Sequence, residues 1–343
     1  MAQSILGPLP NCRFRNRAYF AQTRRSGLRK FSLRAILALE HSMPDSTLSP
    51  TFFRSSLVTV SDVRCRPSCH SCGPEEDASI HGLVFPRTGI FVRHLSAKNH
   101  VVADPTRVLF FNRHETYRVS HPVPGGDDCT TVSFEEKALV DFLQAIDPSI
   151  ADSPSRPFRS PAAASSNALL LRLHRLRQFL RRHGDADPLA AEEMCVSLLT
   201  ESVASASPQP NRLVRPVRGA TRRAHRDLVV ATCVMLARRV PEKMTLAGLA
   251  RAVFSSPFHL ARIFRRETGM SLHGHRNRLR LRLAIEHLAN GTPDLTMLAL
   301  DLGFSSHAHF THTFQGEFGC TPSHFRRELS SRRLREVNRT LDA

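Results

Sequence analysis

Between residues 50 and 135, short runs of apolar residues are separated by residues that form turns. The breaks fall at Pro86, Pro105, Asn112 and the Pro-Gly-Gly-Asp run at 124–127, and such residues interrupt strands. Many short strands at close spacing favour a small barrel or jelly roll. The expected strands are Leu57–Val60, Gly82–Phe85, Gly89–Leu95, Arg107–Phe111, Tyr117–His121 and Cys129–Phe134.

The pattern changes to a helical period at residues 167–183. Leucine recurs there at spacings of four, three and four residues, which predicts an amphipathic helix. A second helix is expected over residues 189–204, so that the two form an antiparallel hairpin. The leucine stripe either caps the preceding strands or pairs with a second copy of the chain, and dimerisation is the preferred interpretation. The leucines of this stripe are Leu169, Leu173, Leu176 and Leu180.

Residues 222–330 keep the helical period and contain an internal repeat. Ser256 and Phe264 fall on Ser306 and Phe314 at a constant offset of fifty residues, and the offset drops by one before these positions. The region therefore holds two copies of one helical unit, the second with a turn one residue longer.

Each copy has the pattern of a helix-turn-helix, in which a short helix and a tight turn precede a second helix. The short helices are expected at Leu246–Ala252 and Thr296–Asp301. The second helices are expected to begin after Ser256 and Ser306, because a serine hydroxyl at this position accepts a hydrogen bond from the backbone at the helix start. Pro257 then occupies the first helical position, where its missing N–H costs nothing.

The outward face of each second helix is predicted to contact DNA, because a major groove about 12 Å wide admits one helix. Leu260 and Phe264, like Phe310 and Phe314, are expected to face inward. The predicted DNA-contact residues are Pro257, Phe258, Ala261, Arg262, Arg265 and Arg266 in the first copy, and His307, Ala308, Thr311, His312 and Gln315 in the second.

A rigid connector must hold the two outward faces about 34 Å apart to match successive turns of the major groove. Residues 271–288 fit this role, because Leu281 and Leu288 belong to an apolar stripe at helical spacing. Arg280 and Arg282 are expected to project from this connector and to contact phosphates.

The overall charge favours a polyanionic partner over a membrane. Lys and Arg number 48 against 30 Asp and Glu in 343 residues, a formal net charge of +18. Residues 221–330 are strongly basic, whereas residues 46–155 are mildly acidic. No apolar stretch approaches the roughly 18 residues that span a bilayer. Eight scattered cysteines are typical of a reducing compartment, so a cytoplasmic location is expected.

The second copy, LTMLALDLGFSSHAHFTHTFQGEFGCTPSHFRR, resembles the signature of the AraC/XylS family of bacterial transcription regulators. The first copy and the connector resemble the same domain. More weakly, ADPTRVLFFNRHETYRVSHPVPGGDDC is similar to the cupin-like sensing domains of some members. The resemblance implies a cytoplasmic, usually dimeric activator or repressor, with a barrel that binds a small effector and a domain that reads two adjacent major-groove segments.

This sequence departs from the family pattern in the second copy. His312 stands where members usually carry an arginine, and Gln315 and Gly316 stand where they carry basic residues. The first copy keeps Arg262 and Arg265. We therefore expect the first copy to dominate the affinity for DNA.

Two patterns raise the question of metal chemistry. Cys65, Cys69, His70 and Cys72 could supply soft ligands to zinc, but the second half of a zinc ribbon is missing, and a loop with reduced thiols is preferred. Five histidines in the strand-rich region suggest a metal-binding cupin site, namely histidines 81, 94, 100, 114 and 121. Such a site needs an H-x-H pair, a nearby carboxylate and a later histidine, and His114-Glu115 alone does not supply them. Neither a metal, a cofactor nor an enzymatic activity is predicted.

The predicted fold is therefore α+β and multidomain, with a small cupin-like β-barrel or jelly roll, a helical hairpin and an all-α double helix-turn-helix domain. The expected function is sequence-specific, effector-responsive regulation of transcription by a homodimer that binds double-stranded DNA and contacts RNA polymerase. The alternatives are nonspecific nucleic-acid binding and a metal-cupin enzyme fused to a DNA-binding domain. The expected segments are a disordered basic extension at 1–45, with Met43 as an alternative start, a sensing domain at 46–155, the hairpin at 160–206, a linker at 207–221, the DNA-binding domain at 222–330 and a basic tail at 331–343.

Overall fold

The computed structural model describes most of the chain from residue 46 to residue 330. The described ranges are 46–48, 51–67, 73–96, 99–183, 187–206, 219–292 and 294–330. The predicted basic extension, most of the predicted linker, the tail and residues Cys69, His70 and Cys72 lie outside these ranges. Within them, no helix is long and apolar enough to cross a membrane.

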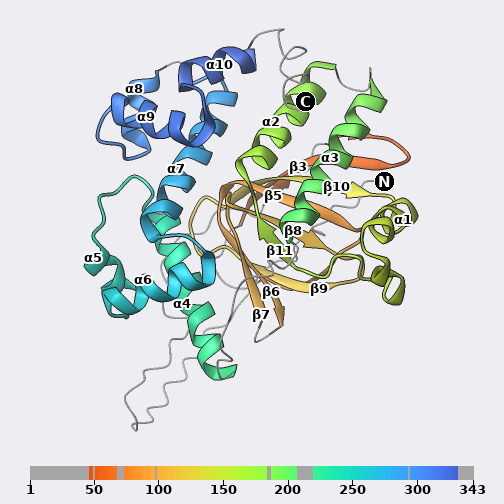
Figure 1. Cartoon of the computed structure of the whole chain (residues 1–343), viewed down its shortest axis with the longest axis horizontal. Coiled ribbons are helices and arrows are strands. Elements are labelled where there is room, and N and C mark those ends of the chain that lie inside the picture. Colours follow the sequence, from red (N-terminus) through yellow and green to blue (C-terminus); the bar gives the residue numbers. More distant parts are fainter. Residues whose placement is uncertain are drawn as a thin grey trace.

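The strands form two antiparallel sheets (Figure 1). The larger has the order β1-β3-β10-β5-β8-β11, with β2 also paired to β3, and the smaller has the order β4-β9-β6-β7. The expected closed barrel is not confirmed, because the described strands remain two separate hydrogen-bonded sheets. The bounds are β1 Ser46–Leu48, β2 Thr51–Arg54, β3 Val58–Arg66, β4 Glu75–Asp77, β5 Gly82–Gly89, β6 Phe91–Ser96, β7 Asn99–Ala103, β8 Arg107–Phe111, β9 Thr116–Ser120, β10 Asp127–Phe134 and β11 Ala162–Ala164.

Both faces of the larger sheet are covered by other parts of the chain. Successive residues of a strand point to opposite faces, so Leu83 and Phe85 pack toward helices while Val84 packs toward the smaller sheet beside Phe91 and Tyr117. Strand β10 is buried along almost its whole length for this reason. The sheet is thus the middle layer between the smaller sheet and a group of helices.

The helices that cover the larger sheet come from the middle of the chain. They are α1 Glu136–Ile146, the short 3-10 helix η2 Pro148–Asp152, α2 Asn167–His183 and α3 Pro188–Ala206. Helices α2 and α3 lie at the residues where the leucine period predicts a hairpin.

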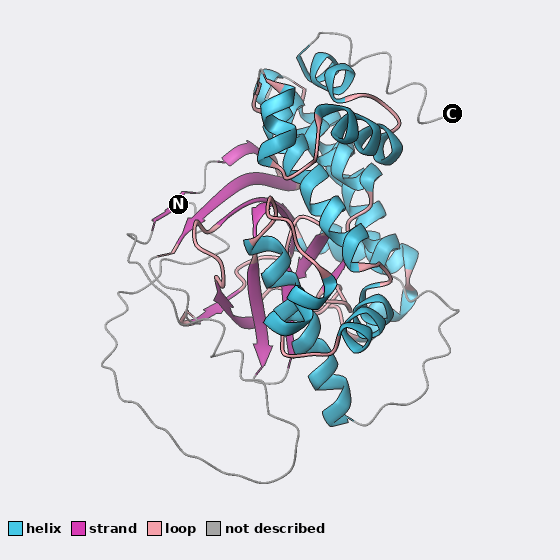
Figure 2. Cartoon of the chain, turned by 90° about the vertical axis from the view of Figure 1, so that its left-hand side faces the viewer, coloured by secondary structure: helices cyan, strands magenta, loops and turns pink. Residues whose placement is uncertain are grey.

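Seven helices follow in the described C-terminal part and gather against one side of the strands (Figure 2). Ile90, Val92 and Val102 of the strand-rich part share a core with α4, α5, α6 and α7, and Leu170 of α2 packs against the later helices. The strands and the C-terminal helices are therefore joined by continuous apolar packing. The bounds are α4 Gly219–Arg238, α5 Leu246–Ala252, α6 Pro257–Thr268, α7 Leu272–Ala289, α8 Leu295–Asp301, α9 His307–Phe318 and α10 Pro322–Ser330.

Candidate nucleic-acid interface

Helices α5 and α6 form the first helix-turn-helix unit. The hydroxyl of Ser256 accepts a hydrogen bond from the backbone N–H of His259 at 3.3 Å, which caps α6 as predicted. The helix ends at Gly269 in the left-handed conformation, with φ of 77°. Leu260 and Phe264 are fully buried, so they fix the rotation of α6 about its axis.

Helices α8 and α9 form the second unit in the same way. Ser306 accepts from the backbone N–H of His309 at 3.1 Å, and Gly319 ends α9 with φ of 76°. Phe310 and Phe314 are fully buried. The predicted repeat is therefore confirmed in its caps and its buried residues, and the structure adds that both second helices end at a left-handed glycine.

The two units lie at opposite ends of α7 (Figure 1). Leu281 and Leu288 of α7 are buried in the core that also holds α8 and α9, whereas Leu279 belongs to the core around α5 and α6. Helix α7 is therefore the connector expected from the sequence, since each end is fixed to one unit.

The predicted outward faces of α6 and α9 are open to solvent in the structure. Phe258 is 89% exposed, and the side chains of Arg262 and Arg265 make no hydrogen bond or ion pair with other residues of the described ranges. Arg266 also lies at the surface but contacts His225 and Glu267. Of the predicted contact residues, Phe258, Arg262, Arg265, Arg266, His307, Ala308, His312 and Gln315 are exposed, and Pro257, Ala261 and Thr311 are half-buried.

The turns of the two units differ at one corresponding position. Gly303 has φ of 79°, and a Cβ added there would lie 2.3 Å from the backbone oxygen of Pro241, so only glycine fits. The first unit has Phe254 instead, with φ of 51° and a side chain that is 71% exposed. A bulky residue in this region is strained.

The expectation that Arg280 and Arg282 project toward DNA is wrong. Arg280 is 7% exposed, and its Nε donates to the backbone oxygen of Val240 at 3.0 Å. Arg282 is 1% exposed and donates to the backbone oxygens of Pro105 and Ser165 at 2.7 and 2.5 Å. The two residues lie on opposite sides of α7: Arg280 faces Val240, just after α4, and Arg282 faces the strand-rich part. Both guanidiniums therefore serve internal backbone acceptors.

The expectation that the leucine stripe of α2 forms a dimer is also wrong. Leu169, Leu173, Leu176 and Leu180 are at most 3% exposed and belong to the core between the larger sheet and α3. The stripe is covered within one chain, so the alternative interpretation, that the hairpin caps the strands, is the one the structure supports.

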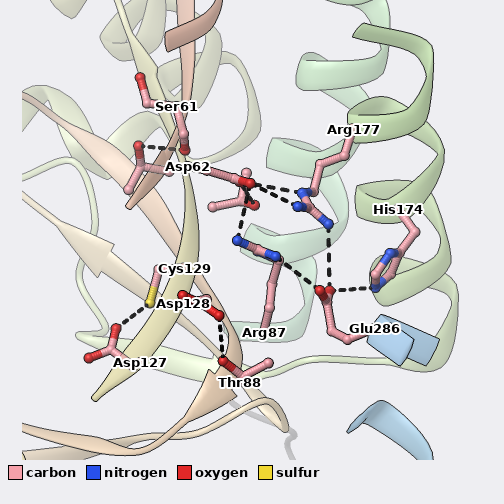
Figure 3. Close-up of polar contacts among 12 residues, drawn as sticks. Ser61, Asp62, Arg87, Thr88, Asp127, Asp128, Cys129, His174, Arg177 and Glu286 are labelled. Atoms are coloured by element: carbon pink, nitrogen blue, oxygen red, sulfur yellow. Dashed lines mark hydrogen bonds and ion pairs between the residues drawn. The ribbon is translucent and has the colours of Figure 1, made fainter. Parts of the chain in front are cut away.

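A buried charge cluster joins the strand-rich part to α2 and α7 (Figure 3). Arg87 of β5 lies between two carboxylates, 3.1 Å from Asp62 of β3 and 2.9 Å from Glu286 of α7. Arg177 of α2 also contacts both, at 2.8 and 3.6 Å, and His174 lies 3.2 Å from Glu286. We call these five residues the charge cluster.

The ionisation of the charge cluster follows from burial and from these partners. Burial raises the pKa of Asp62, but Arg177 and Arg87 more than offset this and lower the pKa below its ordinary value. Burial also raises the pKa of Glu286, and its partners His174, Arg87 and Arg177 lower it again to below the ordinary value. Burial lowers the pKa of His174 to about 4, so this ring is neutral near pH 7.

The residues that the sequence suggested for metal chemistry are only partly brought together. Cys65 and His121 lie beside Asp127, and all three are buried. Asp127, and Cys129 whose thiol contacts it, were not among the metal-ligand candidates expected from the sequence. No local pattern marks them, because their proximity to Cys65 depends on the pairing of β10 with β3.

Comparisons with known proteins agree with the C-terminal geometry. Residues 249–328 match the family model described as a helix-turn-helix domain. The regulatory protein Ada of Salmonella typhimurium is 34% identical over 120 residues, which are 35% of this chain and 33% of that protein. The regulatory protein SoxS of the same species is 26% identical over 106 residues, or 31% of this chain and 99% of that protein.

A crystal structure of a transcriptional regulator with an AraC-type DNA-binding domain, from Chromobacterium violaceum, covers 32% of this chain and 97% of its own, at 23% identity and a TM-score of 0.30. The sequence matches define the class of the C-terminal part as a DNA-binding helix-turn-helix domain. More particularly, the relatives that it matches there, Ada and SoxS, are regulatory proteins. The chain spans about a third of the length of Ada, so the relation to that protein concerns a shared domain.

Proposed function

We propose that this protein is a sequence-specific transcription regulator that inserts α6 and α9 into adjacent segments of the major groove. The observation that carries the proposal is the pair of capped helices at opposite ends of α7, each with its apolar side buried and its polar side open to solvent. Charge alone suffices for nonspecific binding to the phosphate backbone, whereas reading of base edges needs a helix held in a defined orientation.

The two helices contribute unequally to this reading. Arg262 and Arg265 of α6 are exposed cations, and arginine makes the commonest specific contact, to guanine. Helix α9 offers His312 and Gln315 in place of arginines. We therefore assign most of the affinity to α6, with α9 adding specificity through hydrogen bonds and the small side chains of Ala308 and Thr311.

The proposal includes a response to a small effector bound by the strand-rich part, as in the cupin-like sensing domains that this part resembles in sequence. The charge cluster and the contacts of Arg282 connect the strands directly to α7. A change in the strands therefore has a physical route to the connector of the two helix-turn-helix units.

The proposal also retains a homodimer and a contact with RNA polymerase, but through surfaces other than the leucine stripe, which is buried. Light scattering after gel filtration measures the mass in solution, and Leu176→Ala is expected to lower stability without a specific loss of dimer.

Selection of bound fragments from a random DNA pool, followed by fluorescence anisotropy on the recovered site and on scrambled DNA, tests the function. We expect binding to the selected site to be at least about a thousandfold tighter than to scrambled DNA. Near-equal binding would support the competing function, nonspecific association with nucleic acid through the basic surface. The salt concentration is held constant throughout, because phosphate contacts depend steeply on it.

A further inference from the structure

The buried polar group around Cys65 has the composition of a zinc site. Cys65 is at the end of β3, Asp127 and Cys129 are on β10, and His121 follows β9 directly. A ligand atom of Cys65, of His121 and of Asp127 all lie within 4.8 Å of one another. The thiol of Cys129 lies 3.0 Å from the second carboxylate oxygen of Asp127, a contact drawn in Figure 3.

Strand pairing brings these donors together. Cys65 and Asp127 are direct partners in the register of β3 and β10, and side chains of direct partners extend from the same face. Cys129 is two residues further along β10, so it shares the face of Asp127. The sheet therefore sets three of the four donors on one face, with Cys129 reaching the group through its contact with Asp127.

The turn before β10 supplies the fourth donor. Gly126 has φ of 69°, and a Cβ added there would lie 1.9 Å from the backbone oxygen of Cys65, so only glycine permits this close approach. The turn brings His121 back over the patch, with its Nε2 2.7 Å from an oxygen of Asp127. The ring of Phe91 packs beside His121, with centroids 6.1 Å apart, and closes one side.

The chemistry of the four donors suits zinc better than harder ions. Thiolate sulfur and imidazole nitrogen are the usual ligands of structural zinc, a carboxylate oxygen completes some sites, and four ligands in a closed site are typical. All four residues are at most 7% exposed. The guanidinium of Arg66 donates to the backbone oxygens of Cys65 and Asp127, both at 2.9 Å, and places a positive charge beside a site that would hold three anionic ligands.

We propose that Cys65, His121, Asp127 and Cys129 bind one zinc ion that ties the turn before β10 to the end of β3. Zinc binds thiolates and neutral imidazole, so each thiol loses its proton and His121 coordinates without a proton on the ligating nitrogen. Zinc binding therefore releases protons. Without metal, Nε2 of His121 lies 2.7 Å from one oxygen of Asp127, and the thiol of Cys129 donates to the other.

Metal analysis of the full-length chain, purified without a polyhistidine tag, tests the proposal. The wild type is expected to hold about one zinc ion per chain after dialysis. Titration of the metal-free chain with Co²⁺ should give thiolate-to-cobalt charge-transfer absorption and the intense visible bands of tetrahedral coordination. Absence of both zinc and these bands would overturn the proposal without reference to any variant.

Variants locate the site. Cys129→Ser and His121→Gln are expected to weaken zinc binding at least about a hundredfold, and zinc should raise the thermal unfolding midpoint of the wild type but not of Cys129→Ser. Cys233→Ser is the matched control, because Cys233 is also a buried thiol beside a histidine and an aspartate, His275 and Asp104.

A second control removes two of the other thiols of the sequence motif that contains Cys65. The double variant Cys69→Ser, Cys72→Ser should keep its zinc and its cobalt spectrum. Loss of metal from this variant or from Cys233→Ser, with retention in Cys129→Ser, would assign the metal elsewhere and contradict the proposal.

Discussion

Removing the charge of Glu286 tests whether the charge cluster stabilises the folded protein. Glu286 is 4% exposed and lies 2.9 Å from Arg87, 3.2 Å from His174 and 3.6 Å from Arg177. In Glu286→Gln, two buried guanidiniums share the single carboxylate of Asp62. Breaking a buried pair from one side costs about 3–5 kcal/mol, so we expect a loss of that size in the free energy of unfolding.

Urea unfolding followed by circular dichroism measures this loss. The control is Glu242→Gln, because Glu242 is 56% exposed and pairs with Arg239 at 3.7 Å, an arrangement that contributes at most about 1 kcal/mol. If Glu286→Gln lost no more stability than Glu242→Gln, the buried ion pairs of Glu286 would not contribute the stability expected of them.

The double variant Arg87→Met, Glu286→Met sharpens the test. It removes one charge of each sign and leaves Asp62 paired with Arg177, which it contacts at 2.8 Å. Replacing a buried ion pair by apolar residues of similar size is often neutral, so the double variant should be more stable than Glu286→Gln. The single variants Arg87→Met and Glu286→Met complete the cycle. A loss in the double variant equal to the sum of their two losses would show that the pair has no coupling.

Three further predictions follow from other parts of the molecule. Arg262→Ala should weaken binding to the selected site by about 1–3 kcal/mol and relax the choice of one base pair, and an equal loss on scrambled DNA would contradict a reading role. Phe254→Gly should raise the free energy of unfolding by about 0.5–1 kcal/mol, because glycine adopts positive φ without strain, whereas Phe254→Ala should give no such gain. The pKa of His174 is lowered to about 4 by burial and is about 6.5 in the unfolded chain. The unfolded chain therefore takes up the proton first, and the wild type should lose up to about 3 kcal/mol as the pH falls from 6.5 to 4; unfolding of His174→Gln over this range should show a smaller loss.

The helix-turn-helix units could be predicted from the sequence because their signals are local. The two serine caps and an apolar spacing within a dozen residues are enough to place α5 and α8 to within one residue and to place the starts of α6 and α9. The offset of fifty between Ser256 and Ser306 extends the same argument to the repeat.

The errors concern residues whose surroundings come from distant parts of the chain. Arg282 resembles a solvent-facing arginine in its own helix, but its partners, Pro105 and Ser165, are more than a hundred residues away. Leu176 belongs to a stripe that could face either a strand or a second copy, and only the larger sheet decides between them. Likewise, the zinc ligands depend on the register of β3 with β10, which no local pattern specifies.

The most direct test of the account varies the spacing between the two DNA segments that α6 and α9 are proposed to read. Insertion of about five base pairs rotates the second segment to the opposite side of the duplex, while about ten base pairs restore its side but add about 34 Å. Because α7 fixes both units, we predict that either insertion reduces the affinity to that of a site with one segment destroyed. Unchanged affinity on both inserted sites would contradict reading by two rigidly connected helices.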